Sequence, residues 1–524
     1  MSNYTNQKSL SNSMLYKLST KLLILGAVLV FTGSDAVAQR IVKVAPGLGT
    51  LNEAIDSDTT AGGERTDLNT VYELKRGGYY ALEGSIQNRF PLTIVAEDGA
   101  GDRPILLPAA GDGGTSSRPF RARADLTLKG LYITGIDNLD AYNGDQRIIR
   151  ISENDVRIVI DDCHLDGDTQ AALRVDNSGN RIFITNSVIS NIGTSASPDN
   201  GRAIDDRGSQ IDTLVLENNT FYNLTSQVLR DAGGEINYAK VNHNTVVNIG
   251  KNGAFEFGQA VKVIFTNNLI IDGAFYGIPQ AEDEVLSVVS VDSLSQTQID
   301  SLGAASITMS YNNIYSSQTI MDSYPDTVNA PVSFNATALA YIEEGTSGSS
   351  NISESVSFTD GPAVPLNVMT AYYQDPAGEQ PDFPTDGEPF DFGYASSFSS
   401  YTAAVAGQQL GSLIWHGGLH VANEEEVGAD VPGAFVLHGN YPNPFNPTTQ
   451  ISFSLAQAAN VQVDVYNVMG QRLLTVPSQR LSAGASQSIQ IDAASLASGL
   501  YIYRVTAVSA GHSFVNSGRM TLIK

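Results

Sequence analysis

The chain has 524 residues, 42% of them hydrophobic, and a formal net charge of −25 at pH 7. This length can form two or more domains with a large apolar core, and the acidic excess argues against a nucleic-acid partner, because phosphates would be repelled. The single cysteine, Cys163, excludes an internal disulfide. We expect its thiol to be buried among apolar side chains.

Residues 1–38 have the pattern of a secretory signal peptide. Lys17 and Lys21 precede an apolar run at 22–31, and the small residues at 36–38 form a cleavage site. The apolar run is shorter than the roughly 20 residues that a membrane-spanning helix needs. We therefore expect an exported protein with no transmembrane segment after the signal is removed.

Residues 39–417 are expected to form one repetitive domain, with a helical cap near 46–56. Thr50 and Glu53 have the spacing of a capping box at the start of this helix. The end of a repetitive β domain exposes apolar side chains and strand edges, which such a helix would cover.

A repeat dominates the chain from Leu126 to Gly273. Alternating apolar residues are followed by Asn or a substitute, at intervals of about 24 to 32 residues. The Asn position is occupied in turn by Gly130, Asp162, Asn186, Asn218, His243, Asn267 and Tyr311. The alternation has the period of a strand, and Asn tolerates the left-handed backbone of a bend.

Stacking these repeats as coils would satisfy both their polar and their apolar positions. Asparagine amides would hydrogen-bond along a ladder, and we expect His243 to take a buried structural place in it. The interior would be filled by Ile133, Leu165, Ile189, Phe221, Val246 and Ile270. The repeat therefore predicts a parallel β-helix.

The segment 91–106 is similar to the opening coils of pectate-lyase-like β-helix proteins, and this resemblance covers about 41–275. It implies an all-β, right-handed parallel β-helix, and it is a resemblance of fold pattern without a catalytic signature. We expect an insertion near 280–305. The stretch that ends at Trp415 resembles the close of bacterial secreted β-helix proteins, so Trp415 is expected to anchor packing over the last coil.

Charged residues lie between apolar neighbours in several predicted strands. Examples are Ile149-Arg150-Ile151, Leu173-Arg174-Val175 and Leu229-Arg230-Asp231, and further coils supply Ile204-Asp205-Asp206-Arg207 and Phe255-Glu256-Phe257. Stacked strands lie about 4.8 Å apart, so the charged side chains would form one outward column. Such a column on an acidic protein is a candidate groove.

The groove suggests a lyase that acts on an acidic polysaccharide. β-Elimination from a uronate needs a carboxylate neutralised by arginine or by Ca²⁺, followed by removal of a proton, by Lys or Arg in similar lyases. The predicted roles are catalysis for Arg174 and Arg230, substrate binding for Arg150 and Arg207, and Ca²⁺ binding for Asp205, Asp206 and Glu256.

Other interpretations stay open. The charges could simply pair with each other on a solvent-exposed face, and a protonated arginine is a poor base. Asp205-Asp206 is similar to the adjacent aspartates of β-helix polygalacturonases, but the Gly-His-Gly and Arg-Ile-Lys motifs of that family are absent from this domain. The acidic residues at 161–168 match no established calcium loop. Lysine is scarce near the column, which favours the alternative of a non-catalytic glycan-binding or adhesin-type surface protein.

A separate module follows an acidic linker at 418–434. Alternating strands predict a small immunoglobulin-like β-sandwich at 435–524. The segments 441–447, 465–471, 498–501 and 519–524 closely resemble the C-terminal sorting domain of type IX secretion cargo. The resemblance implies the type IX machinery as a partner, a Gram-negative cell of the Bacteroidetes type, removal of this domain, and release from the outer membrane or attachment to it.

Overall fold

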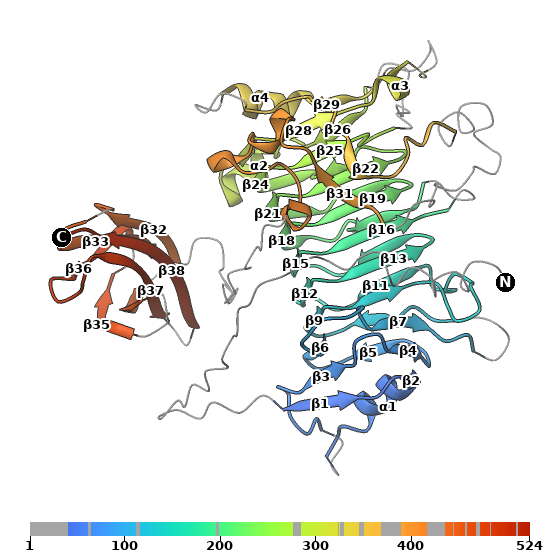
Figure 1. Cartoon of the computed structure of the whole chain (residues 1–524), viewed down its shortest axis with the longest axis horizontal. Coiled ribbons are helices and arrows are strands. Elements are labelled where there is room, and N and C mark those ends of the chain that lie inside the picture. Colours follow the sequence, from blue (N-terminus) through green and yellow to red (C-terminus); the bar gives the residue numbers. More distant parts are fainter. Residues whose placement is uncertain are drawn as a thin grey trace. The chain divides into compact units, whose positions relative to one another are not determined.

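The structure, a computed structural model, contains a long parallel β-helix and a C-terminal β-sandwich (Figure 1). It describes residues 40–60, 64–111, 116–194, 199–275, 285–322, 324, 330–344, 350–367, 389–416, 435–443, 445–455, 458–467, 472–482, 484–509 and 512–524. The expected signal peptide and linker lie outside these ranges. Within them, no helix is long and apolar enough to cross a membrane.

Three parallel sheets form the β-helix. Sheet 1 contains β1 (Ile41–Val44), β3 (Val71–Leu74), β6 (Leu92–Ala96), β9 (Leu126–Lys129), β12 (Arg157–Asp161), β15 (Asn180–Thr185), β18 (Ile211–Glu217), β21 (Glu235–Asn242), β24 (Gln259–Thr266) and β27 (Ser306–Ser310). Sheet 2 contains β2 (Gly47–Leu48), β4 (Tyr79–Leu82), β7 (Ile105–Pro108), β10 (Tyr132–Thr134), β13 (His164–Asp168), β16 (Val188–Ile192), β19 (Thr220–Leu224), β22 (Thr245–Ile249), β25 (Leu269–Ile271) and β28 (Asn313–Tyr315). Sheet 3 contains β5 (Ile86–Asn88), β8 (Phe120–Ala122), β11 (Arg147–Ile151), β14 (Ala171–Val175), β17 (Arg202–Asp205), β20 (Gln227–Arg230), β23 (Phe255–Glu256), β26 (Ser287–Ser290) and β29 (Val332–Phe334).

Each coil passes from sheet 3 to sheet 1 to sheet 2, which gives the right-handed parallel β-helix that the repeat and its resemblance predict. The predicted apolar column is confirmed: its six residues, from Ile133 to Ile270, pair in register through sheet 2 and are all 0% exposed. Cys163 is also buried, and burial raises the pKa of its thiol to about 12. One dry interior therefore runs along the domain.

The bend between sheets 1 and 2 is left-handed, as predicted. All seven residues at the predicted Asn position, from Gly130 to Tyr311, have φ between 51° and 72°. The fully buried ladder, however, lies one residue later than expected. It consists of Asn219, Asn244, Asn268 and Asn312, all 0% exposed, and it ends at the partly buried Asn351. Nδ2 of each of the first four donates to Oδ1 of the next asparagine at 2.9 to 3.0 Å. The side chain after the left-handed residue points into the coil, and the corner residue itself does not.

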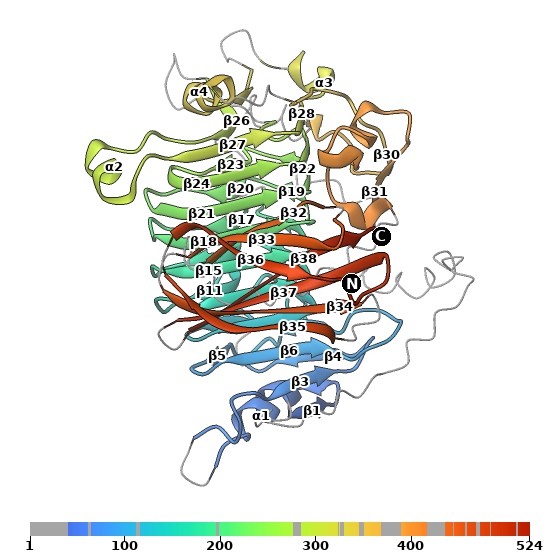
Figure 2. The same ribbon diagram turned by 90° about the vertical axis from the view of Figure 1, so that its left-hand side faces the viewer.

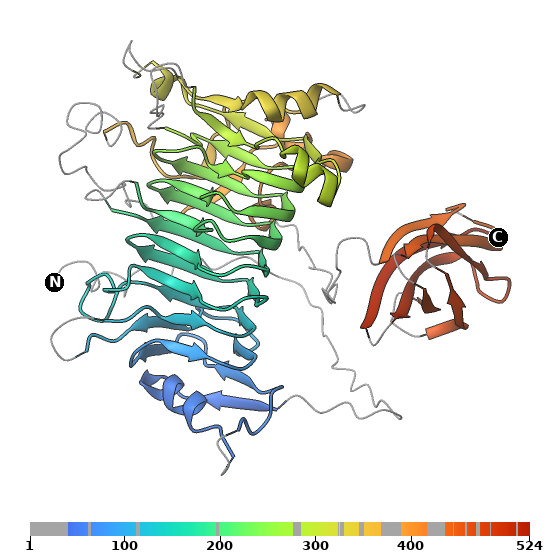
Figure 3. The ribbon, with the colours of Figure 1, turned by 180° about the vertical axis from the view of Figure 1, so that it is seen from behind.

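Helices lie at both ends of the β-helix (Figures 1 and 3). At the N-terminal end α1 (Thr50–Asp56) buries Leu51 and Ile55. The expected capping box is wrong, because Gly49 is the N-cap, at φ 67°, and no side chain caps the helix. Helices α2 (Gln296–Leu302), α3 (Gln318–Met321) and α4 (Ala336–Glu344) follow later in the chain, and α4 buries Ala338 in the same core.

A returning segment covers part of the outer face of sheet 2 (Figure 2). It contains β30 (Phe358–Asp360), β31 (Asp391–Tyr394), η2 (Ser399–Tyr401), η3 (Val405–Gly407) and η4 (Leu413–His416). Trp415 is a packing anchor, as predicted, but it lies on β19 and not on the last coil: Nε1 donates to Thr220 Oγ1 at 2.8 Å and the ring contacts Phe392. His243 is buried, and its Nδ1 lies 3.3 Å from the Gly411 carbonyl oxygen of this segment.

The C-terminal part is a small antiparallel sandwich. One sheet contains β32 (Phe435–Tyr441), β33 (Thr448–Leu455) and β36 (Gly484–Asp492), and the other contains β35 (Arg472–Leu481), β34 (Ala459–Asn467), β37 (Gly499–Ser509) and β38 (His512–Leu522). Phe445, from the first motif of the predicted sorting domain, is buried, and its backbone bonds to Thr521 and Ile523 at the end of the chain. Two of the motifs, far apart in the sequence, therefore meet in one structure.

Candidate functional site

Five of the seven predicted site residues lie in one column on sheet 3. Arg150, Arg174, Asp205 and Arg230 are paired in register across β11, β14, β17 and β20. Glu256 continues the column, because Phe255 before it pairs with Leu229. Arg121 of β8 extends the column at its other end.

Asp176, which the sequence analysis did not single out, holds the first part of the column together. Its carboxylate accepts from Arg150 Nε and, at 2.6 Å, from Arg174 Nε. Burial raises the pKa of Asp176, but the hydrogen bonds from Arg174 and Arg150 outweigh it, so this pKa lies below its ordinary value. Both guanidinium groups are thereby held in a fixed orientation.

Asp205 plays the same part in the middle of the column. It is 1% exposed, Oδ1 accepts from Arg230 Nη1 at 2.9 Å, and Oδ2 lies 3.8 Å from Arg202 Nη1. Arg202 is itself buried, which lowers the pKa of its guanidinium group. Asp205 therefore lies close to two arginines, Arg202 of its own strand and Arg230 of the next coil.

Asp206 and Arg207 leave the column. Asp206 turns away and accepts from the backbone N–H groups of Gly208 and Ala232 at 3.0 and 2.7 Å. Burial and the neighbouring Asp231 carboxyl raise the pKa of Asp206 to about 7. Arg207 is exposed in a turn, with φ 55°.

The three predicted Ca²⁺ ligands are thus not directed at a common point. Within the described ranges, no group of three or more His, Cys, Asp and Glu residues is placed to hold a metal ion. Calcium binding stays a prediction.

Glu256 is the group in this column whose protonation is most sensitive near neutral pH. Burial raises its pKa to about 7, helped by the negative charge of Asp231 and opposed by Gln227, Arg230 and Arg202. A carboxyl group with such a pKa can accept or donate a proton at physiological pH.

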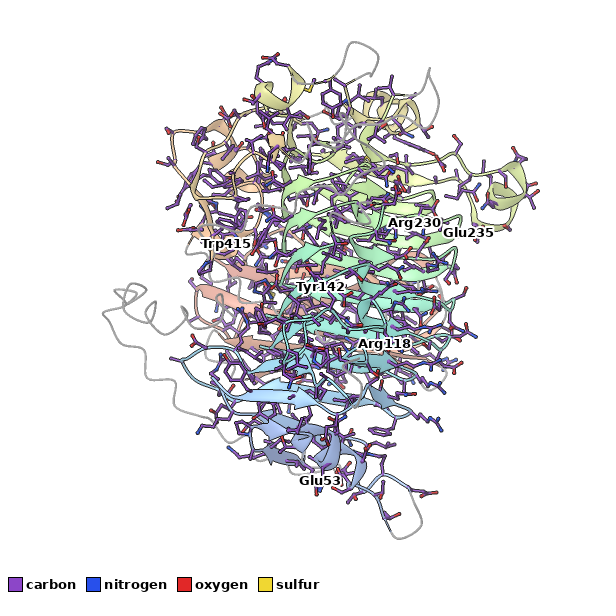
Figure 4. All side chains as sticks on the ribbon, turned by 90° about the vertical axis from the view of Figure 1, so that its right-hand side faces the viewer. Glu53, Arg118, Tyr142, Arg230, Glu235 and Trp415 are labelled. Carbon is purple, nitrogen blue, oxygen red and sulfur yellow. The ribbon has the colours of Figure 1, made fainter. Side chains whose placement is uncertain are left out.

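A second row of arginines runs beside the column, and the sequence analysis missed it. Arg147 pairs in register with Ala171, and this position continues to Arg202 and Gln227 in the next coils. Arg118 lies three residues before Arg121, just as Arg147 lies three residues before Arg150. The repeated spacing Arg-x-x-Arg was the available signal. Figure 4 shows Arg118 and Arg230 on the same side of the β-helix and Trp415 on another.

Sheet 2 carries a Ser, His and Asp cluster that does not have the order of a catalytic triad. Ser190 Oγ donates to Asp166 Oδ1 at 2.7 Å and lies 2.7 Å from His164 Nε2. In a triad, histidine lies between serine and carboxylate, whereas here the serine lies between them and is 0% exposed. Burial lowers the pKa of His164 to about 4, so its ring is neutral. We interpret this cluster as structural.

Comparisons with known proteins identify the tail. Residues 440–513 match the family described as "Secretion system C-terminal sorting domain". The chain is accordingly exported by type IX secretion to the cell surface or the extracellular space. No pectate lyase family matches the β-helix, and no curated protein matches the chain.

Proposed function

We propose that the β-helix domain binds an anionic polysaccharide outside the cell, through the charged outer face of sheet 3. The single observation that carries this proposal is the concentration of arginine there. Seven arginines line this face, on a chain whose net charge is −25: Arg118, Arg121, Arg147, Arg150, Arg174, Arg202 and Arg230. A planar guanidinium group binds carboxylate and sulfate through two parallel hydrogen bonds.

The arginines of the column are oriented by protein carboxylates and still reach solvent. The exposed fractions of the side chains are 28% for Arg150, 19% for Arg174 and 28% for Arg230. Each is held in place by an aspartate, so its guanidinium group presents a positive charge at a fixed position. This supports binding and disfavours the predicted role of Arg174 or Arg230 as a base.

Coil spacing favours a polymer over a small molecule. Neighbouring coils lie about 4.8 Å apart, which is close to the length of one sugar unit in an extended chain. A row of similar charges at this interval can contact successive units of a linear glycan, each contact adding to the affinity. Export by type IX secretion places this face where such polymers occur.

Binding can be tested directly with a panel of polygalacturonate, alginate, a glycosaminoglycan and a neutral glucan. We expect affinity for the charged polymers only, decreasing steeply with salt as counterions are released. Arg174→Gln should weaken binding about tenfold, whereas Arg181→Gln, on sheet 1, should leave it unchanged. Equal binding of the neutral glucan, or no effect of Arg174→Gln, would exclude sheet 3 as the binding face for an anionic polysaccharide.

Glu256 favours a second candidate function, β-elimination from a uronate. Arg230 would bind the substrate carboxylate, and the ionised form of Glu256, whose pKa is about 7, would take the proton from C5. The C4–O bond then breaks, a C4–C5 double bond forms, and the leaving oxygen takes a proton from water. Ultraviolet absorbance of the unsaturated product would report turnover, and Glu256→Gln should abolish it while binding persists. If no uronate polymer gave this absorbance, the elimination reaction would be excluded and only the binding function would remain.

A further inference from the structure

Two arginines of the charged face lack the carboxylate partners that their neighbours have. Arg121 Nε donates to the Ser152 hydroxyl at 3.1 Å, and Arg147 Nη2 donates to the Gln170 side-chain oxygen at 3.0 Å. Both acceptors are neutral, and neither arginine forms an ion pair with any described residue. Arg150, the register neighbour of Arg121, is paired with Asp176.

These residues form a local excess of positive charge, which we call the arginine cluster: Arg118, Arg121, Arg147, Arg150 and Arg174. Among the residues that the structure describes, only Asp145 and Asp176 form ion pairs with its members. Five guanidinium groups and two carboxylates leave a net charge of 5 − 2 = +3. Burial, and to a lesser degree the charges of Arg174, Arg118 and Arg150, lower the pKa of Arg147 to about 10.

The two unpaired arginines lie in different directions from Arg150. Arg121 is its neighbour in the preceding coil, about 4.8 Å away along the stack. Arg147 is three residues earlier on the same strand, about 10 Å away across the stack. Arg121 is held by Ser152, after the end of β11, and Arg147 by Gln170, before the start of β14, so their guanidinium groups are directed toward opposite ends of these strands.

We propose that the arginine cluster binds two anionic groups of one ligand segment, one beside Arg121 and one beside Arg147. The ligand class is then a polysaccharide with more than one negative charge per sugar, such as a sulfated uronate polymer. This inference rests on the proposed binding function and specifies its ligand. A polymer with one carboxylate per sugar would leave part of the positive charge uncompensated.

The test compares two polymers that share a backbone: polygalacturonate and the same polygalacturonate after chemical O-sulfation. Wild-type protein should bind the sulfated polymer at least tenfold more tightly at equal salt. Arg121→Gln and Arg147→Gln should each lose most of this preference and lower the slope of log K against log salt by about one for the sulfated polymer.

Matched variants separate local recognition from total charge. Arg230→Gln, in the column but outside the cluster, should lower the affinity for both polymers by the same factor. Arg181→Gln should lower the affinity for neither. Thermal unfolding checks that each variant is folded. Arg147→Lys keeps the charge but lacks the planar guanidinium group, so its preference for the sulfated polymer should lie between those of wild type and Arg147→Gln. If the double variant Arg121→Gln/Arg147→Gln keeps the full preference, or if wild type binds both polymers equally, the inference is wrong although binding itself stands. If neither polymer binds, the proposed function fails first.

Discussion

Arg230 Nη1 donates to the buried Oδ1 of Asp205, 2.9 Å away in the preceding coil. The bond joins β17 to β20 on the outer face of sheet 3, where Arg202 also approaches the same carboxylate. The Asp205 carboxylate is a structural element of the charged face, because replacing it with an amide removes the negative charge beside both guanidinium groups and weakens the hydrogen bond from Arg230.

Asp205→Asn should therefore lower stability as well as ligand binding. We expect a loss of about 2 kcal/mol in the free energy of unfolding, less than for a fully buried pair because Arg230 is partly solvated. Denaturant unfolding monitored by circular dichroism would measure it. Asp98→Asn, at an exposed turn, is the matched control. Equal unfolding midpoints for both variants would contradict the structural role of Asp205.

Trp415 offers a test that needs no mutation, because it is the only tryptophan of the chain. Its ring lies against Phe392 of β31 and its Nε1 donates to Thr220 on sheet 2, whereas the proposed ligand binds on sheet 3. Saturating polyanion should leave the tryptophan emission maximum unchanged, and unfolding should shift it to longer wavelength. A shift or strong quenching on ligand binding would instead favour Trp415 as a sugar platform.

The buried asparagine ladder gives a third prediction. Asn244 Nδ2 donates to Asn268 Oδ1 and to the Leu216 carbonyl oxygen, and its own Oδ1 accepts from the backbone and side chain of Asn219. Asn244→Ala leaves several buried groups without partners and should destabilise the domain by about 3 kcal/mol. Asn237→Ala, which removes one bond to Asp212 on the outside of sheet 1, should change stability by less than about 1 kcal/mol. Similar losses in the two variants would show that the ladder contributes no more than a surface bond.

The sequence periodicity predicts that a ladder forms at this bend, but it does not predict which asparagines form it. Two adjacent asparagines occur at 218–219 and again at 267–268, and either could occupy the bend. The repeat locates the bend correctly, because Asn tolerates positive φ. Which of the two amides points inward depends on the three-dimensional path after the bend, and no spacing in the sequence carries that information.

The residues of the charged face were likewise predictable from the sequence only in part. Alternation located Arg150, Arg174 and Arg230 because each has a buried neighbour on both sides or on one side. The row of Arg147 was missed because Ile148 and Ile149 are both 0% exposed, so the strand departs from strict alternation and period two places Arg147 inside. Asp176 was missed because it follows the strand and its role appears only when Arg150 and Arg174 come together.

Protonation of Glu256 should make ligand binding depend on pH. Its pKa is raised from 4.5 to about 7, so the side chain is mostly neutral at pH 6 and mostly ionised at pH 8. The groups that act on it are Asp231, Gln227, Arg230 and Arg202. Ionisation places a negative charge beside Arg230, which repels an anionic ligand and partly neutralises the arginine.

Affinity for the anionic polymer should accordingly rise as pH falls from 8 to 6. Glu256→Gln keeps the side chain neutral throughout, so it should bind at pH 8 as tightly as wild type does at pH 6. Some pH dependence should persist in the variant, because Asp206 also has a pKa of about 7. Binding isotherms at constant ionic strength would measure the difference between the two proteins. If wild type and Glu256→Gln showed the same change in affinity over this range, the ligand would bind beyond the influence of Glu256, confined to the coils that carry the arginine cluster.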